Sequence, residues 1–158
     1  MCNTIRLSSA CYAHLKRTIG NMVPEAGGVI GTPIGNPNYI SHAWFDAEAS
    51  GTGGKSVYVP SFEKVTQVVR RWTDRDSVRF AGIVHSHGER YLPRLSSVDI
   101  RSALAILRAN AMPFIDMLLF HGGKLFAFRV FPNGTTEEMQ LIIEPTSPNS
   151  KSQIQNKV

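Results

Sequence analysis

The residues best suited to chemistry are two histidines, His85 and His87, and a carboxylate that follows them, Asp99. Side chains at positions i and i+2 of a β-strand point to the same face, and the apolar residues 78–84 predict a strand that leads into His85. After a turn-forming segment at 88–95, a helical pattern begins, which places Asp99 in the first turn of a helix. Two imidazoles and one carboxylate, with a fourth position open, are typical ligands of a catalytic zinc ion.

Two further side chains could supply the remaining chemistry. The carboxylate of Glu25 could take a proton from a zinc-bound water and pass it to a departing amine, and the hydroxyl of Ser96 could hydrogen-bond the oxyanion. Each feature also has a simpler explanation: two histidines can share a face without a metal, Ser96-x-x-Asp99 is a capping box, and Glu25 could merely begin a strand. All of them together, in this order, favour a metal-assisted amide hydrolase.

The order of these residues along the chain resembles that of the JAMM (MPN+/JAB) metalloproteases. The resemblance rests on Pro24-Glu25-Ala26-Gly27-Gly28, then His-Ser-His, then Ser-x-x-Asp, and it covers essentially all of the chain that we expect to be ordered. It implies that the two histidines and Asp99 hold one Zn²⁺, that Glu25 is the general acid/base, and that Ser96 steadies the oxyanion. It also implies a curved mixed β-sheet flanked by about three helices, similar to the fold of the cytidine deaminases.

Two departures from the family pattern concern the loop after the histidines. Gly88 follows His87 where the family usually has proline, and the interval from His87 to Asp99 is one residue longer than usual. A surface loop absorbs an extra residue at small entropic cost, so the departures bear on loop shape and substrate choice more than on the ligands.

The resemblance implies a zinc-dependent isopeptidase or peptidase, similar to deubiquitinases, whose partner is a ubiquitin-like protein, its conjugate or its precursor. The short chain resembles stand-alone bacterial members, which accompany ubiquitin-like transfer systems, including antiphage operons, and sulfur-carrier pathways. Two alternatives stay open: trimming of a sulfur-carrier precursor, and a catalytically silent scaffold. A nucleobase deaminase is set aside, because its zinc site needs a Cys-x-x-Cys pair that this sequence lacks.

The composition fits one soluble domain. Of 158 residues, 42% are hydrophobic and 18% charged. We expect a domain over 1–145, a disordered polar tail over 146–158, and, without a signal peptide or a long apolar run, a cytoplasmic protein that does not contact membranes. The net charge is +5, but the densest basic group, at 70–79, is interspersed with aspartates and lacks interleaved aromatic residues, so no nucleic-acid partner is expected.

Apolar periodicity predicts a mixed α/β fold whose sheet is largely mixed or antiparallel. Helices are expected from the cap Ser8-Ser9 to Pro24, from the cap Ser61 to Trp72 with Phe62 in its buried stripe, and over 97–110. Strands are expected at 25–32, 39–47, 56–59, 78–84, 114–120, 125–131 and 139–143, with a flexible turn at 51–54 and a tight turn at 121–124. His42 and His121 should pair with backbone carbonyls, and of Cys2 and Cys11 one should be exposed and one packed.

Overall fold

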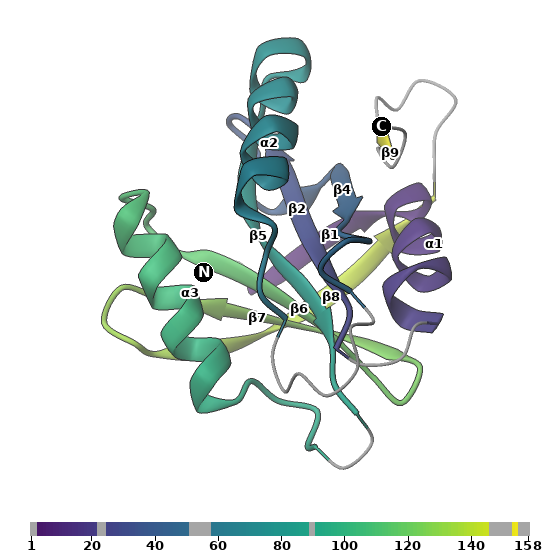
Figure 1. Ribbon diagram of the computed structural model, residues 1–158, viewed down its shortest axis with the longest axis vertical. Coiled ribbons are helices and arrows are strands. Elements are labelled where there is room, and N and C mark those ends of the chain that lie inside the picture. The colour runs from purple at the N-terminus through teal and green to yellow at the C-terminus, as the bar shows by residue number, and fades with distance from the viewer. Residues whose placement is uncertain (1–2, 22–24, 51–57, 89–90, 146–152, 155–158) are drawn as a thin grey trace.

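The computed structural model describes residues 3–21, 25–50, 58–88, 91–145 and 153–154, and these form a mixed α/β fold, as predicted (Figure 1). The helices are α1 (Ser9–Arg17), α2 (Phe62–Asp76) and α3 (Ser97–Ala109), with a 3-10 turn η1 (Ile19–Asn21). The strands are β1 (Thr4–Ser8), β2 (Gly27–Pro33), β3 (Tyr39–Ile40), β4 (His42–Phe45), β5 (Val78–Ser86), β6 (Ile115–His121), β7 (Lys124–Val130), β8 (Thr136–Glu144) and β9 (Gln153–Ile154).

The described strands make one nine-stranded sheet in the order β3-β1-β8-β7-β6-β5-β2-β4-β9. Neighbours β3–β1, β1–β8, β6–β5 and β4–β9 are parallel, and the other pairs are antiparallel, so the sheet is mixed as predicted. Strands β3 and β4 lie near opposite ends of this order although only Ser41 separates them in the chain. The sheet must therefore curve back on itself.

The helices lie on both faces of the sheet. Alternate residues of β6 divide between two cores: Leu118 and Phe120 pack in the core that includes α1, whereas Met117 and Leu119 pack in the core that includes α3. A third core joins Trp72 of α2 to Val29 of β2. Val29 packs in this third core, whereas its neighbour Ile30 packs in the core that includes α1. Since adjacent residues of a strand point to opposite faces, α2 lies on the face opposite α1, which is the face that α3 covers.

Several local predictions are confirmed. Ser8 caps α1, its Oγ accepting a hydrogen bond from the backbone N–H of Cys11 at 3.1 Å. The turn between β6 and β7 consists of Gly122 and Gly123, whose φ angles of 57° and 79° suit a type I′ hairpin. Strand β5 and helix α3 begin and end within three residues of their predicted limits.

Other local predictions were wrong. Helix α1 ends at Arg17, well before Pro24, and β1 was not predicted. Ser61 precedes α2 without capping it, because its hydroxyl donates to Asp46 Oδ1 at 2.9 Å instead. Phe62 is 82% exposed rather than buried.

Some predictions fall on parts of the chain that the structure does not describe. The strand expected at 56–59 is absent at Tyr58 and Val59. Residues 56–57 and the turn expected at 51–54 lie outside the described residues. The tail expected at 146–158 also lies outside them, except for Gln153–Ile154, which pairs with β4 as β9. None of the helices in the described ranges combines the length and the apolar character needed to cross a lipid bilayer.

Candidate metal site

Strand β5 ends between the two histidines: His85 lies in it, and His87 directly follows its last residue, Ser86. The strand lies between β2 and β6, with His85 opposite Gly27 on one side and Leu119 on the other, and the backbone N–H of His87 donates to the carbonyl of Phe120 at 3.0 Å. Both side chains are buried, with 2% of His85 and 8% of His87 exposed. Pairing on both sides of the strand fixes where the two imidazoles leave the backbone.

Helix α3 brings Asp99 to the histidines. The Nε2 atoms of His85 and His87 lie 3.0 Å apart, and each lies 3.2 Å from one oxygen of the Asp99 carboxylate. A capping box holds Asp99 in place: the backbone N–H of Ser96 donates to Asp99 Oδ2 at 2.7 Å, and the backbone N–H of Asp99 donates to Ser96 Oγ at 3.1 Å. The structure thus brings the three predicted ligands together.

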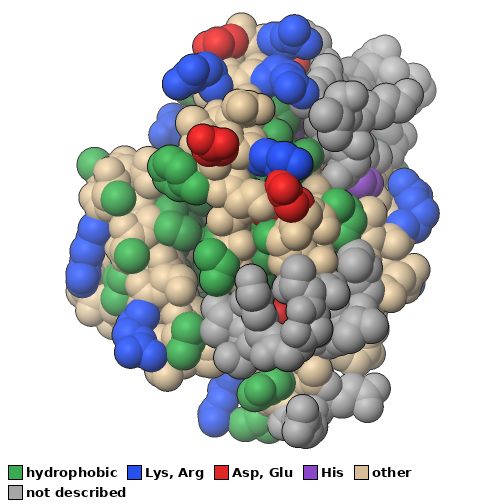
Figure 2. Space-filling view, in the orientation of Figure 1, with side chains coloured by type: hydrophobic (Ala, Val, Ile, Leu, Met, Phe, Trp, Pro, Cys, Tyr) green, Lys and Arg blue, Asp and Glu red, His purple; other side chains and the backbone are tan. Residues whose placement is uncertain are grey.

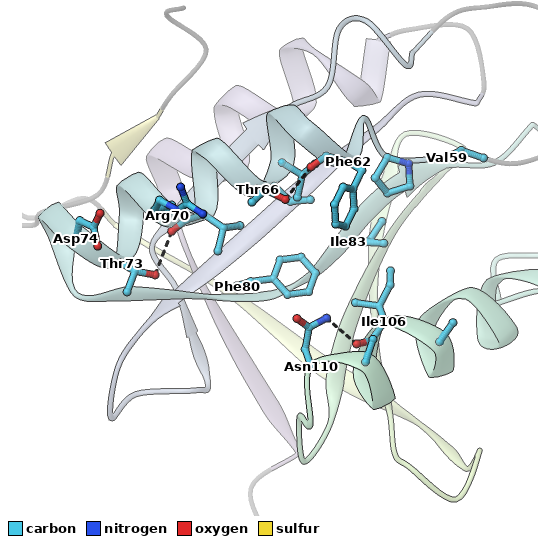
Figure 3. Close-up of a pocket in the computed structure, with 16 residues that line it drawn as sticks. Val59, Phe62, Thr66, Arg70, Thr73, Asp74, Phe80, Ile83, Ile106 and Asn110 are labelled. Atoms are coloured by element: carbon cyan, nitrogen blue, oxygen red, sulfur yellow. Dashed lines mark hydrogen bonds between the residues drawn. The ribbon is translucent and has the colours of Figure 1, made fainter.

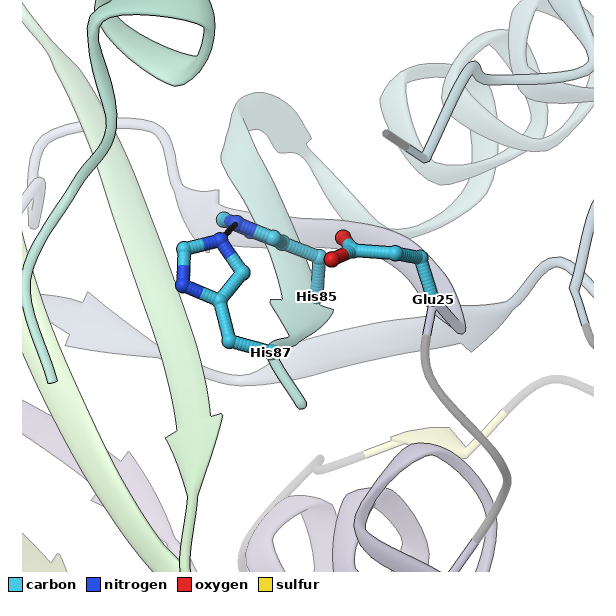
Figure 4. A group of neighbouring side chains, drawn as sticks. All are labelled: Glu25, His85 and His87. Carbon is cyan, nitrogen blue, oxygen red and sulfur yellow. Dashed lines mark hydrogen bonds between the residues drawn. The ribbon is translucent and has the colours of Figure 1, made fainter. Parts of the chain in front are cut away.

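Glu25 lies beside the imidazoles, just before β2 begins. Its carboxylate points toward His85 (Figure 4), and one ligand atom from each of Glu25, His85 and His87 lies within 4.8 Å of the other two. These three residues form a possible metal-binding group. Since Asp99 contacts the Nε2 atoms of the same two histidines, either carboxylate could complete a site built on them.

The two carboxylates differ in their electrostatic surroundings. Burial raises the pKa of Glu25 to about 7; the charge of His87 opposes this shift and that of Asp99 adds to it. Burial would also raise the pKa of Asp99, but hydrogen bonds from both histidines outweigh it and hold that pKa well below its usual range. Asp99 is therefore charged at neutral pH, whereas Glu25 can gain or lose a proton.

His87 is also perturbed by its neighbours. Burial acts to lower its pKa, but the hydrogen bond and charge of Asp99, together with Glu25 and the Leu92 carbonyl, outweigh that effect and raise the pKa. Negative charge thus draws a proton to the imidazole. The same charge would attract a metal cation to the point where the ring nitrogens converge.

Ser96 has a structural role at this site, as the N-cap of α3. This is the capping box that the sequence offered as the simpler explanation. The oxyanion role of its hydroxyl stays a prediction.

The other predicted side chains have ordinary partners. His121 bonds the backbone carbonyl of Tyr91, as predicted. The prediction for His42 was wrong: its ring nitrogens contact Ser41 Oγ at 2.8 Å and Asp76 Oδ2 at 3.1 Å, because β4 passes beside the end of α2. Cys11 is buried and its thiol donates to the carbonyl of Ser41, whereas Cys2 lies outside the described residues.

A buried network that supports the start of β2, next to Glu25, was not predicted from the sequence. Asp46 is fully buried and accepts hydrogen bonds from the Tyr58 hydroxyl and from both the N–H and the hydroxyl of Ser61. The Tyr58 ring covers Gly27 so closely that a Cβ there would lie 2.3 Å from it. The glycines at 27 and 28 were the available signal, since glycine in a strand marks close approach of other atoms.

An apolar groove of about 750 Å³ lies between α2 and α3 (Figure 3). Phe80 and Ile83 of β5 form its floor, Val65 and Val69 line it from α2, and Ile106 lines it from α3. Hydrophobic side chains gather between the two helices, while charged side chains gather over α2 (Figure 2). The groove shares β5 and α3 with the histidine site but contains none of its polar groups.

Comparison with known proteins gives no family assignment: no family model matches the chain, and no curated protein is significantly similar to it in sequence.

Proposed function

We propose that this chain is a zinc-dependent peptidase of the JAMM (MPN+/JAB) type that releases a ubiquitin-like protein from a conjugate or trims its C-terminal extension in the cytoplasm. One observation carries the proposal. Two Nε2 atoms and an ionised carboxylate converge, with a second carboxylate of raised pKa beside them. This pairing is suited to metal binding and proton transfer in one place.

The geometry supports zinc as the ion. Zinc–ligand bonds of about 2.0–2.1 Å at tetrahedral angles put neighbouring ligand atoms about 3.3 Å apart. The two Nε2 atoms are 3.0 Å apart and the nearest Asp99 oxygens are 3.2 Å from them. The two ring nitrogens are therefore close to the spacing of ligands around one ion, and each faces a different oxygen of the Asp99 carboxylate. Imidazole with carboxylate is a donor set that zinc accepts.

The side chains divide the chemistry as follows. When bound, zinc supplies a Lewis acid and an acidified water. The Glu25 carboxylate accepts a proton from the attacking water and returns it to the departing amine, for which a pKa of about 7 in the metal-free site is a suitable starting value. The Ser96 hydroxyl, which already accepts the Asp99 N–H, would donate its own hydrogen to the oxyanion.

The fold supports the same family. A mixed sheet that curves back on itself, helices on both faces, histidines at the end of a strand and Asp99 in the first turn of a helix all agree with what the resemblance implies. The presence of all four ionisable groups favours an enzyme over a silent scaffold. Trimming of a sulfur-carrier precursor is the same reaction on a different substrate.

The test is cleavage of defined substrates. Purified protein is assayed for zinc and incubated with ubiquitin-like proteins that end in diglycine, each joined either to a C-terminal peptide or to a lysine side chain, and products are weighed by mass spectrometry. We expect a cut after the diglycine that a chelator abolishes and added zinc restores. A zinc-loaded protein that cuts none of these substrates would support the scaffold instead, and a cut that persists with the chelator would exclude metal-dependent hydrolysis.

A further inference from the structure

The hydrogen-bond pattern between the antiparallel strands β2 and β5 changes at the end of the paired region. Gly27 pairs with His85, which puts Ala26 opposite Ser86. Opposite residues of antiparallel strands alternate between pairs that exchange two backbone hydrogen bonds and pairs that exchange none, and the position of Ala26 and Ser86 is one of the former. Here Ser86 N–H donates to the Ala26 carbonyl at 2.9 Å, but the Ala26 N–H donates to the side-chain Oγ of Ser86 at 3.1 Å. The hydroxyl takes the place of the backbone carbonyl.

This hydrogen bond is sheltered from water. Ala26 is fully buried and only 5% of Ser86 is exposed. A buried amide that loses its partner cannot easily find water instead, so the chain there depends on this one acceptor.

The hydrogen bond also links the strand that carries His85 to the segment that carries Glu25. Ser86 lies between the two histidines on a strand that is paired on both sides, so its backbone is held in place relative to theirs. Ala26 directly follows Glu25, so the bonded amide belongs to the peptide unit that is attached to the Glu25 Cα. The position of the Ala26 amide therefore limits the positions that the Glu25 carboxylate can occupy.

We propose that Ser86 is a positioning residue for Glu25: its hydroxyl holds the Ala26 amide and thereby keeps the Glu25 carboxylate beside the metal-binding imidazoles. The inference rests on the proposed function for its catalytic consequence. Ser86 acts through Glu25 and is not itself a catalytic group. Removing the hydroxyl should loosen Glu25 and slow proton transfer, while the histidines and Asp99 still bind zinc.

Ser50 provides a matched control. Ser50 is also buried, with 7% of its surface exposed. Its Oγ accepts a hydrogen bond at 3.0 Å from the backbone N–H of Gly27, the residue that follows Ala26. Ser50, however, lies on a different segment from the histidines and holds an amide one residue further from Glu25. The Ser50 hydroxyl also donates to the Gly27 carbonyl at 3.3 Å, so Ser50→Ala removes at least as much buried hydrogen bonding from this segment as Ser86→Ala does. A larger loss of turnover in Ser86→Ala would therefore report on position and not on stability alone.

The first measurement is amide hydrogen exchange, followed by NMR on the metal-free protein. In Ser86→Ala, we expect exchange at Ala26 to become about tenfold faster or more, with Gly27 little changed; Ser50→Ala should show the reverse. Ser86→Thr keeps the hydroxyl and should protect Ala26 as the parent chain does. Unchanged exchange at Ala26 in Ser86→Ala would overturn the proposal without reference to any activity.

The second measurement is turnover of whichever diglycine fusion the parent protein cuts, with zinc affinity measured in parallel. Ser86→Ala should lower kcat by about tenfold or more at nearly constant KM, because proton transfer and not binding is affected. Ser86→Thr should restore most of the rate, and Ser50→Ala should keep the parent kcat. Zinc affinity should be the same in all three; a Ser86→Ala chain that loses zinc, or a Ser50→Ala chain that loses equal kcat, would contradict positioning.

Failure of the proposed function and failure of a variant to fold are each distinguished from failure of this inference. If the parent protein cuts no fusion, the proposed function fails and the exchange data alone judge the placement of Ala26. If Ser86→Ala does not fold, Ser86→Cys takes its place, since a thiol of similar size is a weak hydrogen-bond acceptor. A Ser86→Cys chain with the parent kcat and the parent exchange rate at Ala26 would overturn the proposal.

Discussion

Two carboxylates that differ in character face one pair of imidazoles. Asp99 accepts hydrogen bonds from the Ser96 amide and both histidines, which stabilises its charged form. For Glu25, burial outweighs the opposing charge of His87 and raises the pKa to about 7. Neighbouring carboxyl groups whose pKa values are pushed apart usually divide their roles, so we assign ligation to Asp99 and proton transfer to Glu25.

Substitution of each carboxylate by its amide tests this division. Asp99→Asn should weaken zinc binding by more than the roughly tenfold to hundredfold that loss of an outer-shell partner costs, because it replaces a charged ligand with a neutral amide. Glu25→Gln should bind zinc normally and lose about 10²–10⁴-fold in turnover. Competition with a chromogenic chelator measures the affinity; equal zinc loss in Glu25→Gln would make Glu25 the third ligand.

Zinc affinity should fall as the pH falls. The metal needs neutral imidazoles, and the surrounding negative charge raises the pKa of His87 above its ordinary value, so protons compete with zinc at higher pH than they would at a free histidine. Below that pKa, the apparent dissociation constant should rise about tenfold per pH unit for each proton displaced. Chelator competition between about pH 8 and pH 5 checks this, and an affinity independent of pH would argue against histidine ligation.

At the scale of the elements, the start of α3 combines a cap and a proposed ligand. Ser96→Ala removes the cap and should lower the free energy of unfolding by about 1 kcal/mol, whereas Ser96→Gly should cost only a few tenths, ~0.3 kcal/mol, because glycine is tolerated at that position. Both variants lack the hydroxyl. If Ser96 also serves the oxyanion, both should slow turnover by about 10²-fold despite their different stabilities; a rate that follows stability instead would leave Ser96 as a cap only.

Helix α2 has an apolar stripe that only partly faces the sheet. Trp72 is fully buried, whereas Phe62, at the other end, is 82% exposed beside the groove. Phe62→Ser should therefore change the free energy of unfolding by less than about 0.5 kcal/mol, and Trp72→Ala should cost about 3–5 kcal/mol. Urea denaturation of the two variants compares them directly, and a large cost at Phe62 would mean that this end of the stripe is covered in solution.

Features with local causes could be predicted from the sequence. Alternation brings His85 and His87 to one face, Ser96-x-x-Asp99 begins a helix, and two adjacent glycines make the β6–β7 turn. Each depends on a few neighbouring residues. The mixed α/β class follows from the same local periodicity.

Features decided by distant residues could not be predicted. Strand β1 is only five residues long and pairs in parallel with β8, at the other end of the chain. Ser61 was expected to cap α2, but the buried Asp46 attracts its hydroxyl. Phe62 fits the helical stripe perfectly well, and only the position of the sheet leaves it outside the core.

At the scale of the whole molecule, a buried ion pair ties the sheet together. Arg129 of β7 donates to both oxygens of Asp116 on β6, at 2.8 and 3.1 Å, and to Asn38 at 3.0 Å, with its guanidinium 3.7 Å from the centre of the Phe114 ring. Because Asn38 directly precedes β3, the pair joins the central strands to the outer part of the sheet.

Loss of one partner should cost much more than loss of both. Asp116→Ala leaves a buried guanidinium without its counter-charge and should lower the free energy of unfolding by about 3–5 kcal/mol. A double variant, Asp116→Leu with Arg129→Met, should recover a large part of that loss because apolar groups fill the same space. Chemical denaturation of the parent, the single and the double variants tests this, and equal costs would show that packing and not charge dominates there.

The curvature of the sheet also bears on how the protein behaves in a crowded solution. The outermost described strands, β3 and β9, are each two residues long, so little unpaired backbone is offered along either margin. Long, flat, unpaired margins are templates on which other chains add and fibrils grow. Because both outermost described strands are so short, neither of them presents a long unpaired edge to neighbouring molecules.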